Sequence, residues 1–343
     1  MAKTNPGRFF EDYKLGEVIR HAAPRTVGSG ERALYHALYP ARHALHSSDA
    51  FARSSGLPGS PLDDLAAFHV VFGKTVPDIS LNAVANLGYA EGQWLRPVWP
   101  GDTLRAESEV IGLKQNSNGK SGVVWVRTRG LNQHDEVVIS YVRWVMVRKR
   151  DLEAPAPATI MPELKAALDP ADLRVPEGLD FTRYDFALAG EPHRCADYEI
   201  GERIDHVDGV TIEEAEHMIA TRLWQNTAKV HFDATFRADG SRLIYGGHVI
   251  SMARALSFNG LANAQMIVGL NGGAHANPCF AGQTVKAWSE VIDRADMVAP
   301  GVGALRLRLV ATSGGAPFRL RDDDGKYLPD VLLDLDYWVL MPA

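Results

Sequence analysis

The chain has 343 residues, 46% of them hydrophobic, so it can build one large or two ordinary domains with a substantial core. Charged residues make up 23%, the net charge is −6, and no block of Lys and Arg occurs, which argues against a nucleic-acid-binding or membrane-surface protein. With only two cysteines and neither an apolar leader nor a run as long as a membrane span, we expect a soluble, cytoplasmic protein without disulfides or structural zinc.

The sequence contains an internal repeat. The segment EDYKLGEVIRH at 11–21 returns as ADYEIGERIDH at 196–206, and each matched residue is displaced by 185 positions. The same displacement relates His46 to His231, and PVWPGDTLRAESEV corresponds to PCFAGQTVKAWSEV with a displacement of 181. Such a collinear series indicates two homologous units fused in one chain.

Residues 1–150 form the first predicted unit. The apolar segment DLAAFHVVFGKTV at 64–76 predicts a buried helix near its middle. The later segments GVVWVRTRGL and VVISYVRWVMVRKR are rich in β-branched and aromatic residues and are bounded by turn-forming residues. They therefore predict long strands.

Residues 151–194 are rich in proline, which prevents regular helix or ladder pairing and predicts a connector that wraps around the molecule. The second unit, 195–343, repeats the order of signals seen in the first. An apolar helix is predicted over 248–263, and strand patterns such as GALRLRLVAT follow it. One apolar helix and several antiparallel strands in each unit predict an α+β fold with a sheet wrapped around the helix.

Two segments of the second unit carry residues suited to chemistry. QNTAKVHFD at 225–233 contains His231, and YGGHVIS follows at the predicted helix start. The pattern resembles the signature of the MaoC-like dehydratases, roughly D-x-N-P-x-H-x-D followed by H-G at the start of the central helix. More narrowly, LWQNTAKVHFD and RLIYGGHVISMARALSFNGLANA resemble the mesaconyl-CoA hydratases, also called β-methylmalyl-CoA dehydratases. The resemblance implies a tandem hotdog fold and a hydro-lyase that acts on a short branched enoyl-CoA.

The resemblance also implies roles for individual residues. His231 becomes the candidate acid/base group, because imidazole titrates near neutral pH. Asn226 stands where the family has Asp, and since an amide cannot take a proton, we expect it to orient the water or the imidazole. Gly247 and His248 open the helix, whose free N–H groups could stabilise negative charge on the thioester oxygen. His46 lacks these partners in the first unit, so a structural role is expected for it and catalysis is expected in the second.

Further charged residues are weaker candidates. Asp63 or Asp64 could provide a second carboxylate from the first unit. The mesaconyl group ends in a carboxylate, and burying it unpaired is costly, so a cation should lie in its pocket. Lys229, Arg254 and Arg42 are the candidates for that cation, although each of them alone could simply face solvent.

Three alternatives remain open on sequence alone. The protein could be an R-specific enoyl-CoA hydratase of broader substrate range, a hotdog acyl-CoA thioesterase, or a non-catalytic acyl-CoA-binding module, because the fold does not decide the function. A thioesterase would be expected to use a carboxylate in place of the His motif. No metal or organic cofactor is expected, since no suitable ligand cluster occurs. The expected partners are an acyl-CoA substrate and a second copy of the chain in a homodimer.

Overall fold

The computed structural model describes residues 3–343, which form two structurally similar halves. The elements of the first half are η1 (Phe10–Asp12), β1 (Val18–Thr26), α1 (Ser29–Leu38), α2 (Ala44–Ser47), α3 (Asp49–Ser54), α4 (Asp64–Thr75), η2 (Val76–Ser80), β2 (Ala83–Trp94), β3 (Thr103–Gln115), β4 (Ser121–Leu131) and β5 (Val137–Arg148). The short elements η3 (Pro170–Asp172) and α5 (Phe186–Ala189) lie between the halves.

The second half repeats this order, with a helix-rich segment followed by four long strands. Its elements are η4 (Cys195–Asp197), β6 (Arg203–Thr211), α6 (Glu214–Leu223), α7 (Lys229–Phe232), η5 (Ala234–Phe236), α8 (Gly246–Leu256), α9 (Phe258–Leu261), β7 (Met266–His275), β8 (Thr284–Asp296), β9 (Val302–Thr312) and β10 (Val331–Pro342). In residues 3–343, no helix combines the length and the apolar character needed to cross a bilayer.

All ten strands belong to one antiparallel sheet, in the order β1-β3-β4-β5-β2-β7-β10-β9-β8-β6. The order reads the same from either edge once each strand is replaced by its repeat equivalent, so a pseudo-twofold axis passes between β2 and β7. These two strands pair in register, with Tyr89 opposite Gly273 and Gln93 opposite Gly269. The architecture is the tandem hotdog that the resemblance implied, with the two units that the repeat predicted.

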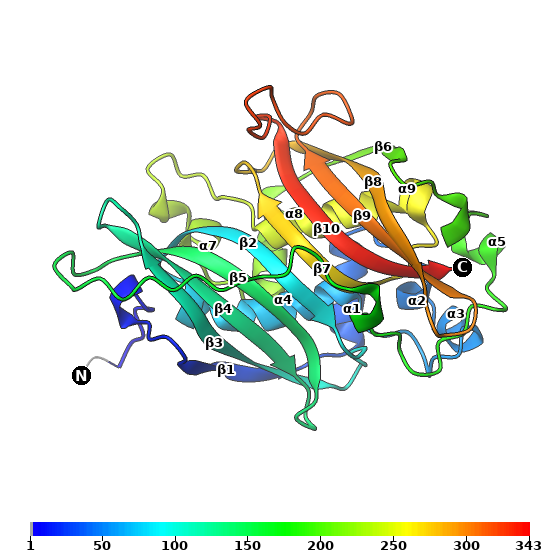
Figure 1. Cartoon of the computed structure of the whole chain (residues 1–343), viewed down its shortest axis with the longest axis horizontal. Helices are drawn as coiled ribbons and strands as arrows, with labels where there is room; N and C mark the ends of the chain where they lie inside the picture. The colour runs from blue at the N-terminus through cyan, green and yellow to red at the C-terminus, as the bar shows by residue number, and fades with distance from the viewer. Residues whose placement is uncertain (1–2) are drawn as a thin grey trace.

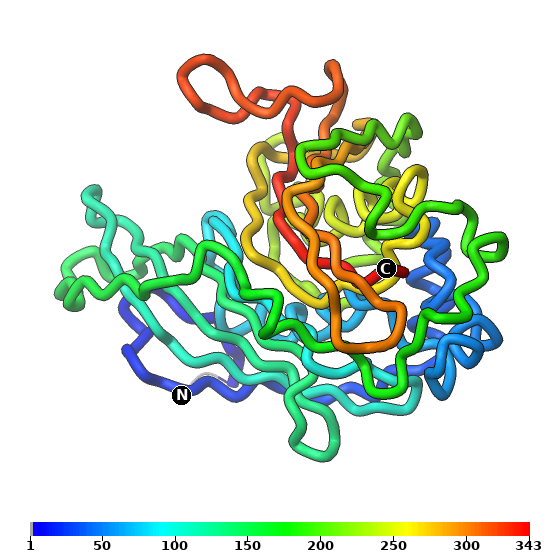
Figure 2. Tube along the Cα trace, turned by 45° about the vertical axis from the view of Figure 1, so that its right-hand side comes forward, coloured from blue at the N-terminus to red at the C-terminus, as the bar shows by residue number. Residues whose placement is uncertain are grey.

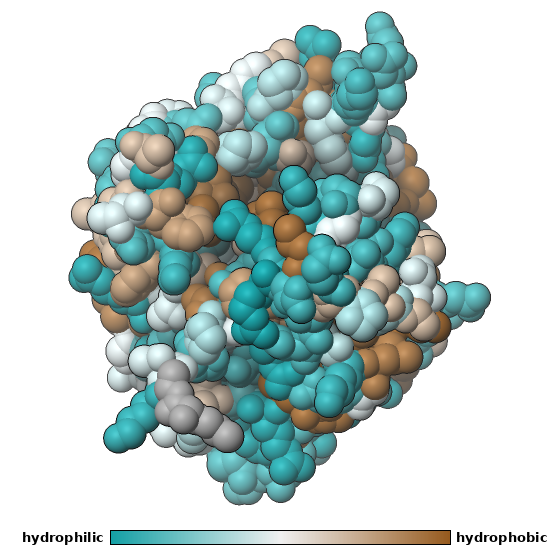
Figure 3. Space-filling model, turned by 90° about the vertical axis from the view of Figure 1, so that its left-hand side faces the viewer, coloured by the Kyte–Doolittle hydropathy of each residue, from teal (hydrophilic) through white to brown (hydrophobic). Residues whose placement is uncertain are grey.

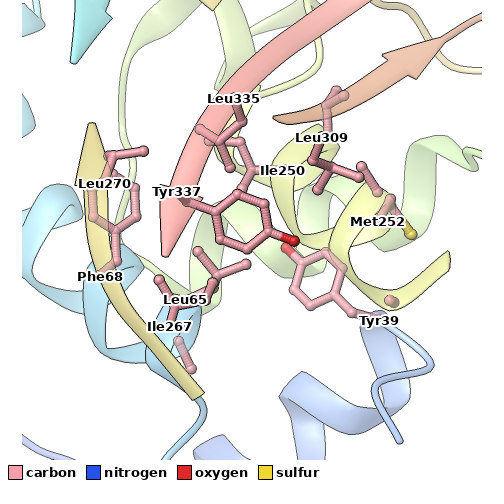
Figure 4. Packing of buried hydrophobic residues seen from close by; sticks show 14 of the residues in the cluster. Tyr39, Leu65, Phe68, Ile250, Met252, Ile267, Leu270, Leu309, Leu335 and Tyr337 are labelled. Carbon is pink, nitrogen blue, oxygen red and sulfur yellow. The ribbon is translucent and has the colours of Figure 1, made fainter. Parts of the chain in front are cut away.

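The helices α4 and α8 lie on one face of the sheet, which curves around them (Figure 1). Every residue of α4 is buried, which explains why its sequence is apolar all round rather than amphipathic. Phe68 of α4 and Ile250 of α8 meet Leu270 and Tyr337 of the sheet in one core (Figure 4). Burial of each such side chain contributes about 1.5–3 kcal/mol to folding.

The first unit's central helix approaches the second unit very closely at Gly73. A Cβ atom at this position would lie 1.7 Å from the Trp224 carbonyl oxygen. Only glycine allows this distance between α4 and the segment that leads into α7. The contact fixes the position of the two units on the helix side of the sheet.

The connector runs over the opposite face of the sheet and then around the second unit, as the green segment in Figures 1 and 2 shows. It is anchored by polar contacts such as the Leu168 N–H, which donates to Asn271 Oδ1 at 2.8 Å. Its apolar side chains join a second core with residues of α2, α3, β7 and β10. The connector residues in that core are Leu168, Leu173, Leu179, Phe181, Tyr184 and Ala189.

Candidate active site

A cavity of about 300 Å³ lies where the two units meet on the helix side. The second unit contributes residues of α7, the start of α8 and the end of β7, and the first unit contributes residues of α4, β2 and β5. The end of the molecule that carries the N-terminus shows hydrophobic surface gathered around a hollow (Figure 3). The size of the cavity suits a small acyl group.

His231 lines this cavity from the short helix α7. Its ring Nδ1 lies 2.7 Å from the Leu243 carbonyl oxygen, so Nδ1 carries the proton and donates it, and Nε2 keeps a free lone pair. Burial lowers the pKa of His231 to about 4, although the Leu243 bond works against this shift. The imidazole is therefore neutral at pH 7 and able to accept a proton.

Asn226 also lines the cavity, and only 1% of its surface is exposed. Its Oδ1 accepts a hydrogen bond from the Ala228 N–H at 3.3 Å, which fixes the orientation of the amide next to α7. The structure thus brings Asn226 and His231 together at one cavity, as the resemblance implied.

Helix α8 begins at Gly246, directly beside the cavity. The preceding Tyr245 is its N-cap, and the Tyr245 N–H donates to His217 Nε2 at 2.9 Å. The N–H groups of Gly246 and Gly247 have no acceptor within the helix, as in the first turn of any helix. The macrodipole and these free donors favour negative charge at this point.

Gly247 and His248 were expected to open the helix and present their N–H groups to the substrate, but the helix begins one residue earlier, at Gly246. Neither residue lines the cavity, while Gly246 does. A Cβ atom at Gly247 would lie 2.5 Å from the Tyr245 ring and 2.6 Å from His69, so this glycine is required for packing. The His248 imidazole is fully buried, with Nδ1 3.0 Å from the Tyr39 hydroxyl.

The three cations proposed for the substrate carboxylate all lie outside the cavity, so that prediction is wrong for each of them. Lys229 is exposed at the surface, and Arg42 is exposed with its guanidinium 4.4 Å from the Phe258 ring centroid. Arg254 is buried, but it donates to Ser257 Oγ at 3.0 Å and to the Ala264 carbonyl.

Asp63 and Asp64 are also absent from the cavity lining, so neither supplies a second carboxylate there. Asp63 caps α4 by accepting from the Leu65 N–H at 2.9 Å. Asp64 lies 3.2 Å from His46 Nε2 and accepts from the Ile267 N–H at 2.7 Å.

The first unit's copy of the site is closed by the ion pair between His46 and Asp64. Burial lowers the pKa of His46, but the charge and hydrogen bond of Asp64 outweigh this and raise it to about 9. The helices α4 and α8 begin at Asp64 and Gly246, so the carboxylate occupies the position that glycine leaves open in the second unit. His46 is structural in this arrangement.

Several lining residues were missed by the sequence analysis, among them His275, Tyr89, Asn86 and Arg143. The Tyr89 hydroxyl lies 3.2 Å from His275 Nε2, and burial, assisted by nearby His231, lowers the pKa of His275 to about 4. The sequence held a signal for Arg143, which is the only charged residue within the apolar run VVISYVRWVMV. All four lie on β2, β5 or β7. These strands are neighbours at the centre of the sheet, and the repeat alone did not reveal this arrangement.

Comparisons with known proteins agree with this fold and identify the family. A family model described as mesaconyl-CoA hydratase matches residues 1–313. The chain is 76% identical over 341 residues to the mesaconyl-CoA hydratase of Cereibacter sphaeroides and 58% identical over 349 residues to the β-methylmalyl-CoA dehydratase of Chloroflexus aurantiacus, with 99% of each chain covered in both cases. The crystal structure of a MaoC domain dehydratase from Chloroflexus aurantiacus matches with a TM-score of 0.97 at 57% identity, covering 100% of this chain and 99% of the other. A double-hotdog protein from Mycobacterium tuberculosis, 24% identical with a TM-score of 0.74 over 98% of each chain, shares the fold.

Proposed function

The chain belongs to the mesaconyl-CoA hydratase family, and we propose that it adds water reversibly to mesaconyl-CoA to give β-methylmalyl-CoA. The observation that carries this proposal is the neutral His231 imidazole in a cavity that also contains the start of α8. Conjugate hydration of a thioester needs both a proton acceptor for water and donors for the developing enolate. The second unit supplies both beside one space.

In the hydration direction, His231 Nε2 accepts a proton from water while the water oxygen bonds to the β-carbon of the enoyl group. The electrons of the C=C bond move toward the thioester oxygen, where the first-turn N–H groups of α8 donate to the negative charge. The protonated imidazole then releases its proton to the α-carbon. Water is added across the double bond and His231 returns to its starting state.

Asn226 has a positioning role in this scheme. Its Oδ1 is held by the Ala228 N–H, so its NH₂ group has a defined orientation at the cavity. An amide cannot exchange a proton at neutral pH, so Asn226 holds the water molecule by hydrogen bonding while His231 performs the proton transfer.

Thioester hydrolysis is the less favoured alternative. A hotdog thioesterase would require a carboxylate as base or nucleophile. Among the described residues, 3–343, those that line the cavity include neither Asp nor Glu. The two reactions are distinguished by absorbance. Hydration removes the conjugated thioester band without releasing thiol, whereas hydrolysis produces free CoA that reacts with a thiol reagent.

The decisive experiment is that assay over mesaconyl-CoA and crotonyl-CoA with the purified protein. We expect loss of the conjugated band with mesaconyl-CoA and no thiol release. Thiol release at the same rate as the loss of absorbance would contradict the proposed hydratase activity.

The proposal extends to cofactors and assembly. The proton acceptor and the hydrogen-bond donors that hydration needs are groups of the chain itself, so we propose that CoA enters only as part of the substrate and that treatment with a chelator leaves the rate unchanged. We also propose a homodimer, by analogy with the family, although the two units of one chain already pair with each other. Light scattering during size-exclusion chromatography tests this, and a mass of one chain would contradict it.

A further inference from the structure

Arg143 is a buried cation with unused hydrogen-bond donors. It lies on β5, and its side chain has no exposed surface. Nη2 donates to Thr75 Oγ1 at 2.7 Å, whereas Nε and Nη1 have no hydrogen-bond partner. The residue nevertheless lines the cavity that contains His231.

No carboxylate in residues 3–343 lies within 4.0 Å of the Arg143 guanidinium. The guanidinium carbon lies 4.3 Å from the Phe72 ring centroid, an interaction that offsets only part of the cost of burying a charge. By contrast, Arg306 on β9 is partly exposed and still forms two short bonds to Asp336. Among the described residues, Arg143 is the arginine that lines the cavity, and it has no carboxylate partner.

Asn86 stands near Arg143 with both polar side-chain atoms buried and unpartnered. It lies on β2 opposite Val145, which is two residues along β5 from Arg143 and therefore on the same face of the sheet. Asn86 also lines the cavity. An arginine with free donors and an amide donor in the wall of one cavity are suited to binding a carboxylate.

Aromatic rings connect this group to the candidate base. The His231 ring centroid is 5.9 Å from that of Tyr245, which is 5.5 Å from that of Phe72, beneath Arg143. Arg143 and His231 therefore line the same cavity, and packed aromatic rings lie between them.

The repeat shows that this arrangement is not a general property of the fold. Alignment of YVRWVMV with LDYWVLM places Tyr337 at the position equivalent to Arg143. In the second unit the buried cation is on the helix instead, at Arg254, where Ser257 and the Ala264 carbonyl accept its hydrogen bonds. Of these two buried arginines, Arg143 is the one whose Nε and Nη1 have no hydrogen-bond partner.

We propose that Arg143, assisted by Asn86, binds the free carboxylate of the substrate's acyl group and so selects carboxylated enoyl-CoA over plain alkyl enoyl-CoA. The inference rests on the proposed function and names its specificity determinant. In mesaconyl-CoA the carboxylate is attached to the β-carbon, the atom that water attacks. Holding the carboxylate therefore also fixes the β-carbon relative to His231.

The test compares kcat/KM for mesaconyl-CoA and crotonyl-CoA in the wild type and in Arg143→Met. The variant should lose about 10–100-fold with mesaconyl-CoA, the effect of a lost charge-assisted pair, and keep its rate with crotonyl-CoA. Lys229→Met, which removes an exposed cation next to His231, is the matched control and should change neither value. An unchanged mesaconyl-to-crotonyl ratio in folded Arg143→Met would overturn the proposal.

Two further measurements keep the outcome decisive. If Arg143→Met does not fold, Asn86→Leu at the partly exposed start of β2 should lower the same ratio by about tenfold, and no change there would count against the proposal. Binding of the saturated methylsuccinyl-CoA, measured by calorimetry, should be weakened by either variant while butyryl-CoA binding is retained. If the wild type does not hydrate mesaconyl-CoA at all, the proposed function fails, and the calorimetric comparison still judges the carboxylate site.

Discussion

The single side-chain hydrogen bond of His231, from Nδ1 to the Leu243 carbonyl, sets its tautomer and leaves Nε2 to accept a proton. Replacing the residue by alanine removes the acid/base group without removing the α8 terminus. We expect His231→Ala to lower kcat for hydration by about 10²–10⁴-fold, the usual effect of such a loss. The measurement is the decrease in enoyl-thioester absorbance at saturating substrate.

His46→Ala is the matched control, because His46 is the repeat equivalent of His231. Its removal leaves Asp64 buried without its partner, which should cost about 3–5 kcal/mol of stability. The kcat of the folded fraction should stay near the wild-type value. Equal losses of kcat in both variants would contradict the assignment of catalysis to the second unit.

The depressed pKa of His231 predicts an unusual pH profile. An unperturbed imidazole would lose its basic form below about pH 6.5. Because burial lowers the pKa of His231 to about 4, kcat/KM should stay constant from pH 8 to about pH 5 and fall only at lower pH. A midpoint near 6.5 in the kcat/KM profile of the wild type would show that another group, or a more solvated His231, governs the reaction.

At the scale of elements, α4 matters because it lies against the second unit through Gly73. Gly73→Ala would place a methyl group on the Trp224 carbonyl and push α4 away from the segment that carries Asn226. Such overpacking costs about 1–3 kcal/mol or more, which urea unfolding would measure. Gly30→Ala in α1, where no atom lies within 4 Å of the new methyl group, should instead gain about 0.5–1 kcal/mol. Equal effects of the two substitutions would show that the close approach is unimportant.

The central helices were predictable from sequence because each is a long apolar segment. The helix predicted over 248–263 was too long, because α8 ends at Leu256. The helical conformation is interrupted at Asn259 and Gly260, and Gly260 has a φ of 96°. A glycine within an apolar run carries too weak a signal to place that break.

The cavity was predictable only where its residues are adjacent in sequence. His231 and Asn226 fall within one short motif, and the start of α8 follows it. Arg143 and His275 come from strands that meet only when β2 pairs with β7. No local pattern encodes that pairing, so these lining residues could be identified only from the structure.

The whole molecule should be sensitive to acid because many of its histidines are kept neutral. Burial lowers the pKa of six of them, namely His43, His69, His206, His217, His231 and His275. Their contribution to the free energy of unfolding is complete when the pH is above the histidine pKa of the unfolded chain, near 6.5. The contribution is lost as the pH falls toward the lower pKa values of the folded state, by up to about 1.4 kcal/mol per pH unit for each group.

His46 acts in the opposite direction, since its raised pKa of about 9 gives stability below pH 6.5 that is lost as the pH rises through 9. The free energy of unfolding should therefore be greatest near neutral pH and fall steeply between pH 6.5 and 5. Urea midpoints at pH 7, 6 and 5 measure this. A midpoint that stays constant over the range would show that these histidines become protonated in the folded protein.

The pairing of Arg143 with Tyr337 as repeat equivalents has an evolutionary consequence. In a dimer of identical single units, every mutation appears in both active sites, so an arginine gained for substrate choice would appear twice. In the fused chain, each copy can change separately. The second unit carries the His231 motif, and the first unit contributes Arg143 to the same cavity. On the role proposed for Arg143, the substrate preference can therefore change without a change in the reacting groups.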